Sequence, residues 1–123
     1  VNVNVIIPAI PDKKTVYAMT KQSCKKLIKA GVKIYSYTDG FIHAKNIVAD
    51  GIAGVVGTIN LDYRSFVHHY ECGVYMYDTQ AVRQMYEDLT ETCKKSKLLD
   101  GSFRLKLWEK LVCMVTYVFR PML

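Results

Sequence analysis

The stretch FIHAKNIVADGIAGVVGTIN, residues 41–60, decides how the middle of the chain folds. Residues 41–49 and residues 52–58 are rich in β-branched and small apolar side chains, and the dipeptide Asp50-Gly51 lies between them. Asp-Gly is typical of tight hairpin turns, because both residues tolerate the positive φ that such turns require. The stretch therefore predicts two antiparallel strands that are joined at this dipeptide.

The rest of the chain predicts strands and helices on both sides of this hairpin. Before it we expect a strand over residues 1–7 that stops at Pro8, a helix over 13–30 with Asp12 as its N-cap and Gly31 as its stop, and a strand over 32–37. After it we expect a loop over 60–67, a strand over 70–77, a helix over 79–95, a linker over 98–101 and an amphipathic helix over 103–119 that ends before Pro121.

This order of elements is typical of an α/β fold, with a mixed β-sheet flanked by helices and a C-terminal amphipathic helix. Residues 1–97 are expected to form the main domain, and residues 98–123 a linker and helix. The C-terminal helix combines Trp108 with basic residues, which suits either a membrane-interface helix or a helix packed on its own domain. The lysines of the helix over 13–30 are predicted to be a solvated face, and attraction to an anionic surface is the rarer alternative.

The hairpin also carries a set of polar side chains suited to binding phosphate. His43 and Lys45 are two residues apart, so they share one face of the predicted strand. Thr58 and Asn60 have the same spacing at the end of the returning strand. An ammonium group neutralises phosphate charge, while a hydroxyl and an amide donate hydrogen bonds to it. Together these residues predict a phosphate site at one end of the hairpin.

The composition agrees with a globular protein but does not identify its ligand. The chain has 123 residues, half of them hydrophobic, and a formal net charge of +6. A basic surface suits nucleic acid, anionic lipid or phosphorylated substrates. The four cysteines lie far apart in the sequence, and the chain has only three histidines, so no zinc-type motif is present. We therefore expect free thiols in a reducing compartment. No signal peptide or spanning apolar run is visible, and Val1 lies inside a predicted strand, so we expect a fragment of a longer protein.

One spacing pattern points to a known family. His43, Lys45 and Asp50 form H-x-K-x(4)-D, and Gly57, Thr58 and Asn60 form the downstream G-T-x-N. This combination resembles the signature of the phospholipase D superfamily. The flanking stretches NLDYRSF at 60–66 and AGVKIYSYT at 30–38, with the closing FRPML at 119–123, resemble the C-terminal half of the bacterial cardiolipin synthase branch.

The resemblance implies roles for individual residues. One histidine would attack a phosphodiester to form a phosphohistidine, and a second would act as general acid and then as base; His43 can take either role. Glu71, expected on the next strand, would orient His43, while Lys45, Thr58 and Asn60 would bind the phosphate. Asp50 would support a turn and Gly57 would have a structural role in the motif. Asp62 and Arg64 would brace the loop after Asn60. No metal or organic cofactor is implied.

The resemblance also implies a substrate and a partner. It predicts a phosphatidyltransferase that joins two molecules of phosphatidylglycerol, an anionic phospholipid, into cardiolipin at a bacterial cell membrane and releases glycerol. The second histidine–lysine motif would come from the N-terminal half of the same protein or from a homodimer, and the isolated fragment would be soluble and inactive. Two alternatives remain open: a homodimeric phosphodiesterase or nuclease, and an inactive membrane-surface module. The apolar C-terminal segment disfavours nucleic acid.

His68 and His69 are less informative than His43. Adjacent residues of an extended chain face opposite sides, so both cannot join one site. Ordinary loop or strand-edge positions are therefore expected for this pair.

Overall fold

The computed structural model describes residues 1–10 and 14–118, so the predicted Asp12 cap and the closing residues 119–123 lie outside the described part. The described residues form two compact units. The first contains Val1–Ile42 together with the described part of Lys95–Arg120, and the second contains His43–Lys94.

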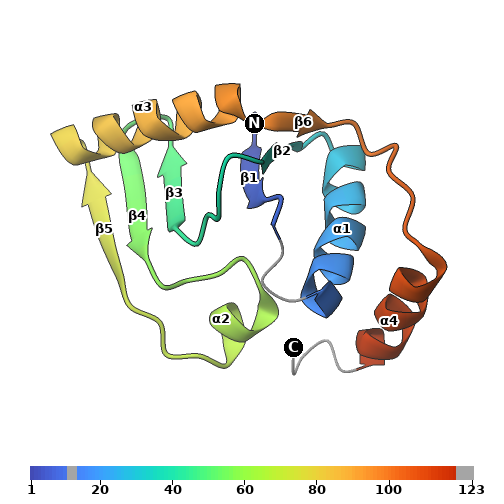
Figure 1. Ribbon diagram of the computed structural model, residues 1–123. Coiled ribbons are helices and arrows are strands. Elements are labelled where there is room, and N and C mark those ends of the chain that lie inside the picture. Colours follow the sequence, from blue (N-terminus) through green and yellow to red (C-terminus); the bar gives the residue numbers. More distant parts are fainter. Residues whose placement is uncertain (11–13, 119–123) are drawn as a thin grey trace. The chain divides into compact units, whose positions relative to one another are not determined.

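The first unit is built on a three-stranded sheet in the order β1-β2-β6. Strand β1 (Asn4–Pro8) and strand β2 (Lys33–Tyr37) are parallel, and helix α1 (Lys14–Lys29) connects them, as a parallel pair requires (Figure 1). Strand β6 (Lys97–Leu99) pairs with β2 in the antiparallel sense. Gly31 has a φ of 92° just past α1, which confirms the predicted glycine stop.

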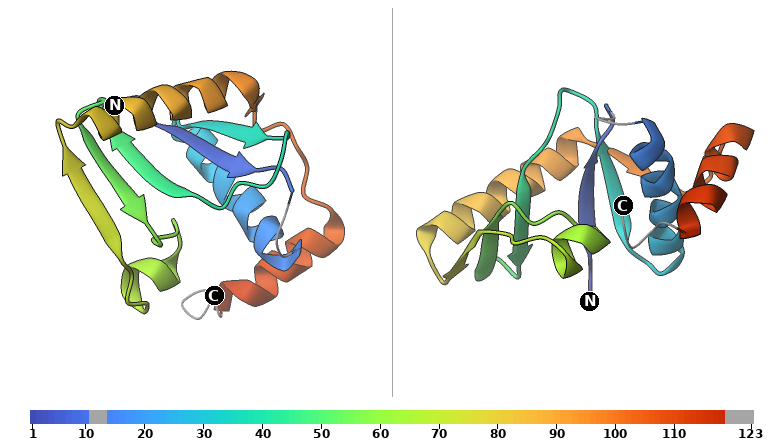
Figure 2. Two further views of the ribbon diagram at one scale, coloured as in Figure 1. Left: turned by 60° about the vertical axis from the view of Figure 1, so that its left-hand side comes forward. Right: turned by 90° about the horizontal axis from the view of Figure 1, so that it is seen from below.

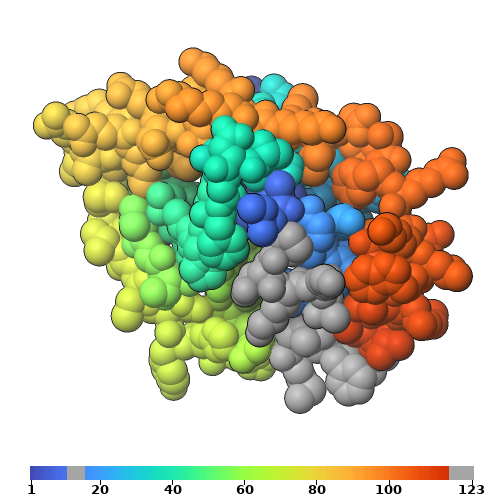
Figure 3. Space-filling view, in the orientation of Figure 1, coloured from blue at the N-terminus to red at the C-terminus, as the bar shows by residue number. Residues whose placement is uncertain are grey.

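Helix α4 (Leu107–Val118) belongs to this first unit and packs against α1 (Figure 3). The Lys21 ammonium lies 2.8 Å from Glu109 Oε1, and the Lys106 backbone N–H donates to Glu109 Oε2 at 2.7 Å. Cys113 of α4 is buried, as are Ala18 and Cys24 of α1. The C-terminal helix is thus held against α1 by packing and by a part-buried ion pair.

The second unit contains an antiparallel sheet in the order β3-β4-β5. The sheet consists of β3 (Lys45–Ala49), β4 (Ala53–Gly57) and β5 (Gly73–Tyr77), and it is accompanied by α2 (Tyr63–Val67) and α3 (Gln80–Lys95). Asp50 and Gly51 both have positive φ, 53° and 67°, between β3 and β4. The predicted hairpin is therefore confirmed, and Asp50 is a turn residue as expected.

Helix α3 runs across the three strands (Figure 2). A Cβ atom on Gly54 of β4 would lie 2.6 Å from Met85 Cε and 3.2 Å from Val82 Cγ2. Glycine at this position thus allows α3 to approach the sheet closely, and Val82 is fully buried there.

The fold class is confirmed: sheets flanked by helices, with a C-terminal helix. Several boundaries differ from the prediction. Residues 60–67 contain the short helix α2, because Asp62 caps its N-terminus, and part of the predicted linker pairs with β2 as strand β6. Strand β3 begins at Lys45 and strand β5 at Gly73, so His43 and Glu71 each lie before a strand instead of within it.

The C-terminal region also differs from the expected organisation. Helix α4 begins at Leu107 instead of residue 103. The domain boundary expected at 97/98 stays a prediction, while contacts group the described residues from Lys95 onwards with the first unit. The physical reason is that β6 pairs with β2 and α4 packs against α1, which joins this region to the first unit. Among the described residues, no helix has both the length and the apolar character needed to cross a membrane.

Candidate active site

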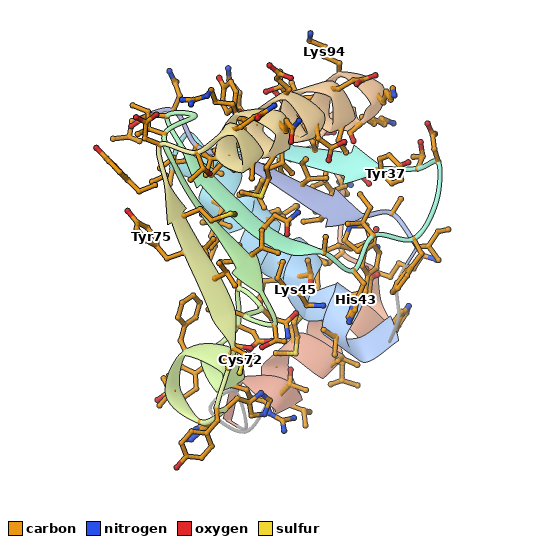
Figure 4. All side chains as sticks on the ribbon, turned by 90° about the vertical axis from the view of Figure 1, so that its left-hand side faces the viewer. Tyr37, His43, Lys45, Cys72, Tyr75 and Lys94 are labelled. Carbon is orange, nitrogen blue, oxygen red and sulfur yellow. The ribbon has the colours of Figure 1, made fainter. Side chains whose placement is uncertain are left out.

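The histidine–lysine pair lies at the start of β3. Lys45 is the first residue of the strand, and its Nζ donates to the backbone carbonyl of His43 at 2.6 Å. Figure 4 shows the two side chains in the same region of the second unit. The strand-alternation argument for this pair was wrong, because His43 precedes the strand. The contact that joins the two residues runs from the Lys45 side chain to the His43 backbone, and the shared face of their side chains stays a prediction.

Strand register places the G-T-x-N glycine beside this pair. Lys45 is directly opposite Gly57, and Gly57 is directly opposite Gly73. A Cβ atom on Gly57 would lie 2.3 Å from the Cys72 carbonyl oxygen and 2.7 Å from Gly73 Cα. Both obstacles are backbone atoms that cannot rotate away, so only glycine fits here. Gly57 therefore allows β4 and β5 to meet closely at the end where Thr58 leaves the sheet.

Thr58 and Glu71 are brought together by this close approach. The Thr58 N–H donates to the Cys72 carbonyl at 2.9 Å, and the Cys72 N–H donates to Thr58 Oγ1 at 3.1 Å. The Thr58 hydroxyl in turn donates to Glu71 Oε2. The sequence predicted a phosphate-binding hydroxyl and an orienting carboxylate as separate parts of the site; here they are hydrogen-bonded partners.

The Glu71 carboxylate has a further neighbour. The His69 Nδ1 atom lies 3.4 Å from its Oε1. The pKa of Glu71 is lowered from the usual value near 4.5, first by the Thr58 hydroxyl, then by Ser65, with a smaller contribution from His69 and a partial opposition from desolvation. Glu71 is therefore an ionised carboxylate at neutral pH, and its side chain is 13% exposed.

The loop after Asn60 is held by local hydrogen bonds. Asp62 has an extended backbone and caps α2, and its Oδ1 accepts from the Ser65 N–H at 2.8 Å. The Asn60 N–H donates to Ser65 Oγ at 3.2 Å. The Arg64 carbonyl accepts from the N–H groups of His68 and His69, at 2.9 and 2.8 Å. Asp62 and Arg64 thus both contact the loop and helix that follow Asn60.

His68 and His69 have different partners. The His68 ring lies 5.5 Å from the Tyr63 ring in an edge-on arrangement, whereas His69 contacts Glu71. His68 is the helical C-cap of α2 and His69 follows it, and the contact of His69 with Glu71 was not predicted. The missed signal was spacing, because residues two apart in an extended chain face the same side, and His69 is two residues before Glu71.

Ser65 is the other residue that the sequence did not single out. It is 6% exposed, whereas Phe66, the next residue of α2, is 65% exposed. Its three-residue distance from the Asp62 cap was the available signal, because an N-cap side chain receives the N–H of the third residue of the helix. Across the described part of the chain, no cluster of three or more His, Cys, Asp and Glu side chains could hold a metal ion.

Comparison with known proteins shows the family of this chain. Residues 1–93 match the family described as "Cardiolipin synthase, PLD-like domain". The chain belongs to this family. The PLD-like domain is 38% identical over 125 aligned positions to the cardiolipin synthase of Listeria monocytogenes, covering all of this chain and 26% of that protein. It is 35% identical over 101 positions to cardiolipin synthase 2 of Bacillus cereus, covering 82% of this chain and 20% of that protein.

An uncharacterized protein of Streptococcus mutans is 46% identical to the PLD-like domain over 125 positions, covering all of this chain and 27% of that protein. The chain therefore spans about a quarter of the length of the curated relatives that it matches.

Proposed function

We propose that this PLD-like domain supplies one histidine–lysine half of a site that transfers a phosphatidyl group between two phosphatidylglycerol molecules. The observation that carries the proposal is the arrangement at one end of the β3-β4-β5 sheet. Lys45 of the His43–Lys45 pair lies opposite Gly57. Thr58 is the next residue after Gly57, and its hydroxyl donates to Glu71. The products are cardiolipin and glycerol, and the reaction takes place at a membrane surface because both substrates are lipids.

The reaction has two steps, which form and then break a phosphohistidine. A histidine nitrogen attacks the phosphorus of one phosphatidylglycerol, a P–N bond forms, and the bond from phosphorus to the glycerol headgroup breaks. A second histidine donates a proton to the departing glycerol oxygen. That histidine then removes the proton from the headgroup hydroxyl of the second phosphatidylglycerol, whose oxygen attacks phosphorus as the P–N bond breaks. His43 is either the nucleophile or the acid–base group.

The remaining residues act on charge and orientation. An ammonium has three donors, and Lys45 directs one of them to the His43 carbonyl, so the others suit phosphate oxygens. Asn60 is exposed and would supply an amide donor to the phosphate. Glu71, kept ionised by its lowered pKa, accepts from the ring of His43, sets its tautomer and stabilises the imidazolium that forms. Because the Thr58 hydroxyl donates to Glu71, its primary role is to hold that carboxylate.

This site requires a second histidine–lysine motif. The N-terminal half of the same protein or a second copy of this chain would supply it. The curated relatives are about four times as long as the chain and have room for such a half. The monomeric 123-residue chain is accordingly expected to be inactive alone.

The test uses His43→Ala in the full-length protein that contains this chain. Phosphatidylglycerol vesicles are the substrate, and cardiolipin formation and glycerol release are measured together. We expect both rates to fall by about two to four orders of magnitude if His43 is the acid–base group, the usual range for the loss of such a group. If His43 is the nucleophile, the fall should be at least as large. The matched control is His68→Ala, which removes an exposed imidazole whose ring lies edge-on to the Tyr63 ring and should leave both rates unchanged.

Two results would contradict the proposal. Near-normal cardiolipin synthesis by His43→Ala would remove His43 from the chemistry. Cleavage of DNA by a homodimer of the chain, without turnover of lipid, would assign the same residues to a nuclease.

A further inference from the structure

Helix α4 has two unlike faces, and its more apolar face is turned to solvent. The face against α1 contains Glu109 and Cys113, which are 3% and 5% exposed. The opposite face consists of apolar side chains that are 54% to 85% exposed: Leu107, Leu111, Met114 and Val115. Positions three, four or seven residues apart lie on one side of a helix, so these four form a continuous stripe. We call this stripe the outer face of α4.

The outer face is the reverse of what a helix needs when it packs only within its own domain. An amphipathic helix of a globular protein buries its apolar side and directs polar residues to water. Here the side that packs internally carries an ion pair instead, in which the Lys21 ammonium lies 2.8 Å from Glu109 Oε1. Adjoining exposed apolar side chains mark a surface that contacts another molecule or a membrane. The outer face therefore has the character of a contact surface.

The charged side chains that this region presents to solvent are all basic. Arg104, Lys106 and Lys110 are exposed. Glu109 is the one acidic residue between positions 103 and 118, and its carboxylate is buried and paired with Lys21. An apolar stripe accompanied by unneutralised cations complements a phospholipid surface, which offers anionic headgroups above an apolar interior.

Trp108 lies at the edge of the outer face. It is three residues before Leu111 and seven before Val115, and it is 45% exposed. Tryptophan is enriched at the boundary between lipid headgroups and acyl chains, because its ring is apolar whereas its N–H is polar. The combination of a basic flank, an apolar stripe and a tryptophan is typical of a helix that lies in the plane of a membrane interface.

We propose that the outer face of α4 docks the protein on the surface of an anionic phospholipid bilayer. The stripe enters the boundary between headgroups and acyl chains, and Arg104, Lys106 and Lys110 contact lipid phosphates. The Lys21–Glu109 pair holds the opposite side of the helix on α1, so the first unit is docked together with α4. The docking does not depend on the chemistry, but its benefit to phosphatidyl transfer rests on the proposed function.

The test uses the single tryptophan of the chain as a reporter of α4. The 123-residue chain is titrated with vesicles of phosphatidylglycerol and phosphatidylcholine, and Trp108 fluorescence gives the binding curve. We expect the emission to move to shorter wavelength, and lipids brominated on their acyl chains to quench it, because the indole ring enters an apolar environment. Binding should weaken with added salt and on vesicles of phosphatidylcholine alone, because the cations are attracted to anionic headgroups.

Three substitutions separate the apolar contribution from the electrostatic one. Leu111→Gln keeps a good helix-forming side chain and removes apolar surface, so the binding constant should fall about tenfold or more. Lys110→Gln should lower binding to phosphatidylglycerol vesicles about fivefold and leave binding to phosphatidylcholine vesicles unchanged. The control is Leu27→Gln, the same change at an exposed leucine of α1, which should bind vesicles as the wild type does.

Docking and chemistry can be measured apart. His43→Ala in the 123-residue chain should bind vesicles as the wild type does, because His43 belongs to the second unit and α4 to the first. If the full-length protein transfers no phosphatidyl group, the proposed function fails, but the vesicle titration still decides whether α4 docks on lipid.

The proposal is overturned if the wild-type chain does not bind anionic vesicles, or if Leu111→Gln binds them equally well. Should Leu111→Gln not fold, Met114→Gln changes the same stripe and decides in its place. Dimers in sedimentation that Leu111→Gln abolishes, without binding to vesicles, would assign the outer face to a second copy of this chain.

Discussion

Two carboxylates, one in each compact unit, have lowered pKa values for different reasons. Glu109 of α4 is 3% exposed and is bound by the Lys21 ammonium at 2.8 Å and by the Lys106 N–H at 2.7 Å. Its pKa is lowered first by the hydrogen bond from Lys21 and then by the Lys106 backbone. Glu71 accepts instead from the Thr58 hydroxyl and lies beside the His69 imidazole.

The identity of the partners separates the two roles. The charge of Glu109 is already neutralised by a fixed cation, so the pair serves to hold α4 against α1. The main partners of Glu71 are neutral donors, so its negative charge remains available to an imidazolium. A lowered pKa alone therefore does not mark a functional carboxylate, because ion pairs that only hold a fold produce it too.

The largest expected effect is on catalysis by Glu71→Gln. This change keeps the shape of the side chain and removes the charge that stabilises an imidazolium. Phosphatidyl transfer by the full-length protein should fall by about two to four orders of magnitude. Full transfer activity in this variant would give Glu71 the same merely structural role as Glu109.

A smaller effect, on stability instead of activity, is expected for Glu109→Gln. The amide cannot neutralise Lys21, whose side chain is 28% exposed and keeps some hydration. Urea unfolding should show a loss of about 1–3 kcal/mol, the usual cost of losing a hydrogen bond between charged groups. Glu87→Gln, which alters an exposed glutamate of α3, should stay within about 0.5 kcal/mol. Equal losses in the two variants would show that the Lys21–Glu109 pair does not hold α4.

The smallest effect is the pH dependence of stability. Both folded-state pKa values lie below the ordinary value near 4.5, so each carboxylate stabilises the fold above that value. This contribution is lost as the pH falls through the lowered values, because the unfolded chain takes up protons first. The free energy of unfolding, measured from neutral pH downwards, should stay level until about pH 4.5 and then decrease. Glu109→Gln should decline less steeply than wild type, and an equal slope would contradict the lowered pKa of Glu109.

Much of the fold was predictable from local signals. Asp50-Gly51 specifies its own turn, since only a few residues accept positive φ at both positions, and Gly31 ends α1 for the same reason. The pairing of β6 with β2 was not predictable, because a three-residue strand carries almost no pattern of its own. The start of β3 at Lys45 was missed because the apolar pattern continues before the backbone pairing begins.

The sequence by itself determined the residue types of the site and their spacing: His43 and Lys45, then Gly57, Thr58 and Asn60. Only the tertiary structure decided which of them are partners. Thr58 meets Glu71 across 13 residues, and Lys21 meets Glu109 across 88. Turn and cap signals act over a few residues because they depend on local backbone geometry. Contacts such as these depend on strand register and helix packing, which are fixed only when the whole unit folds.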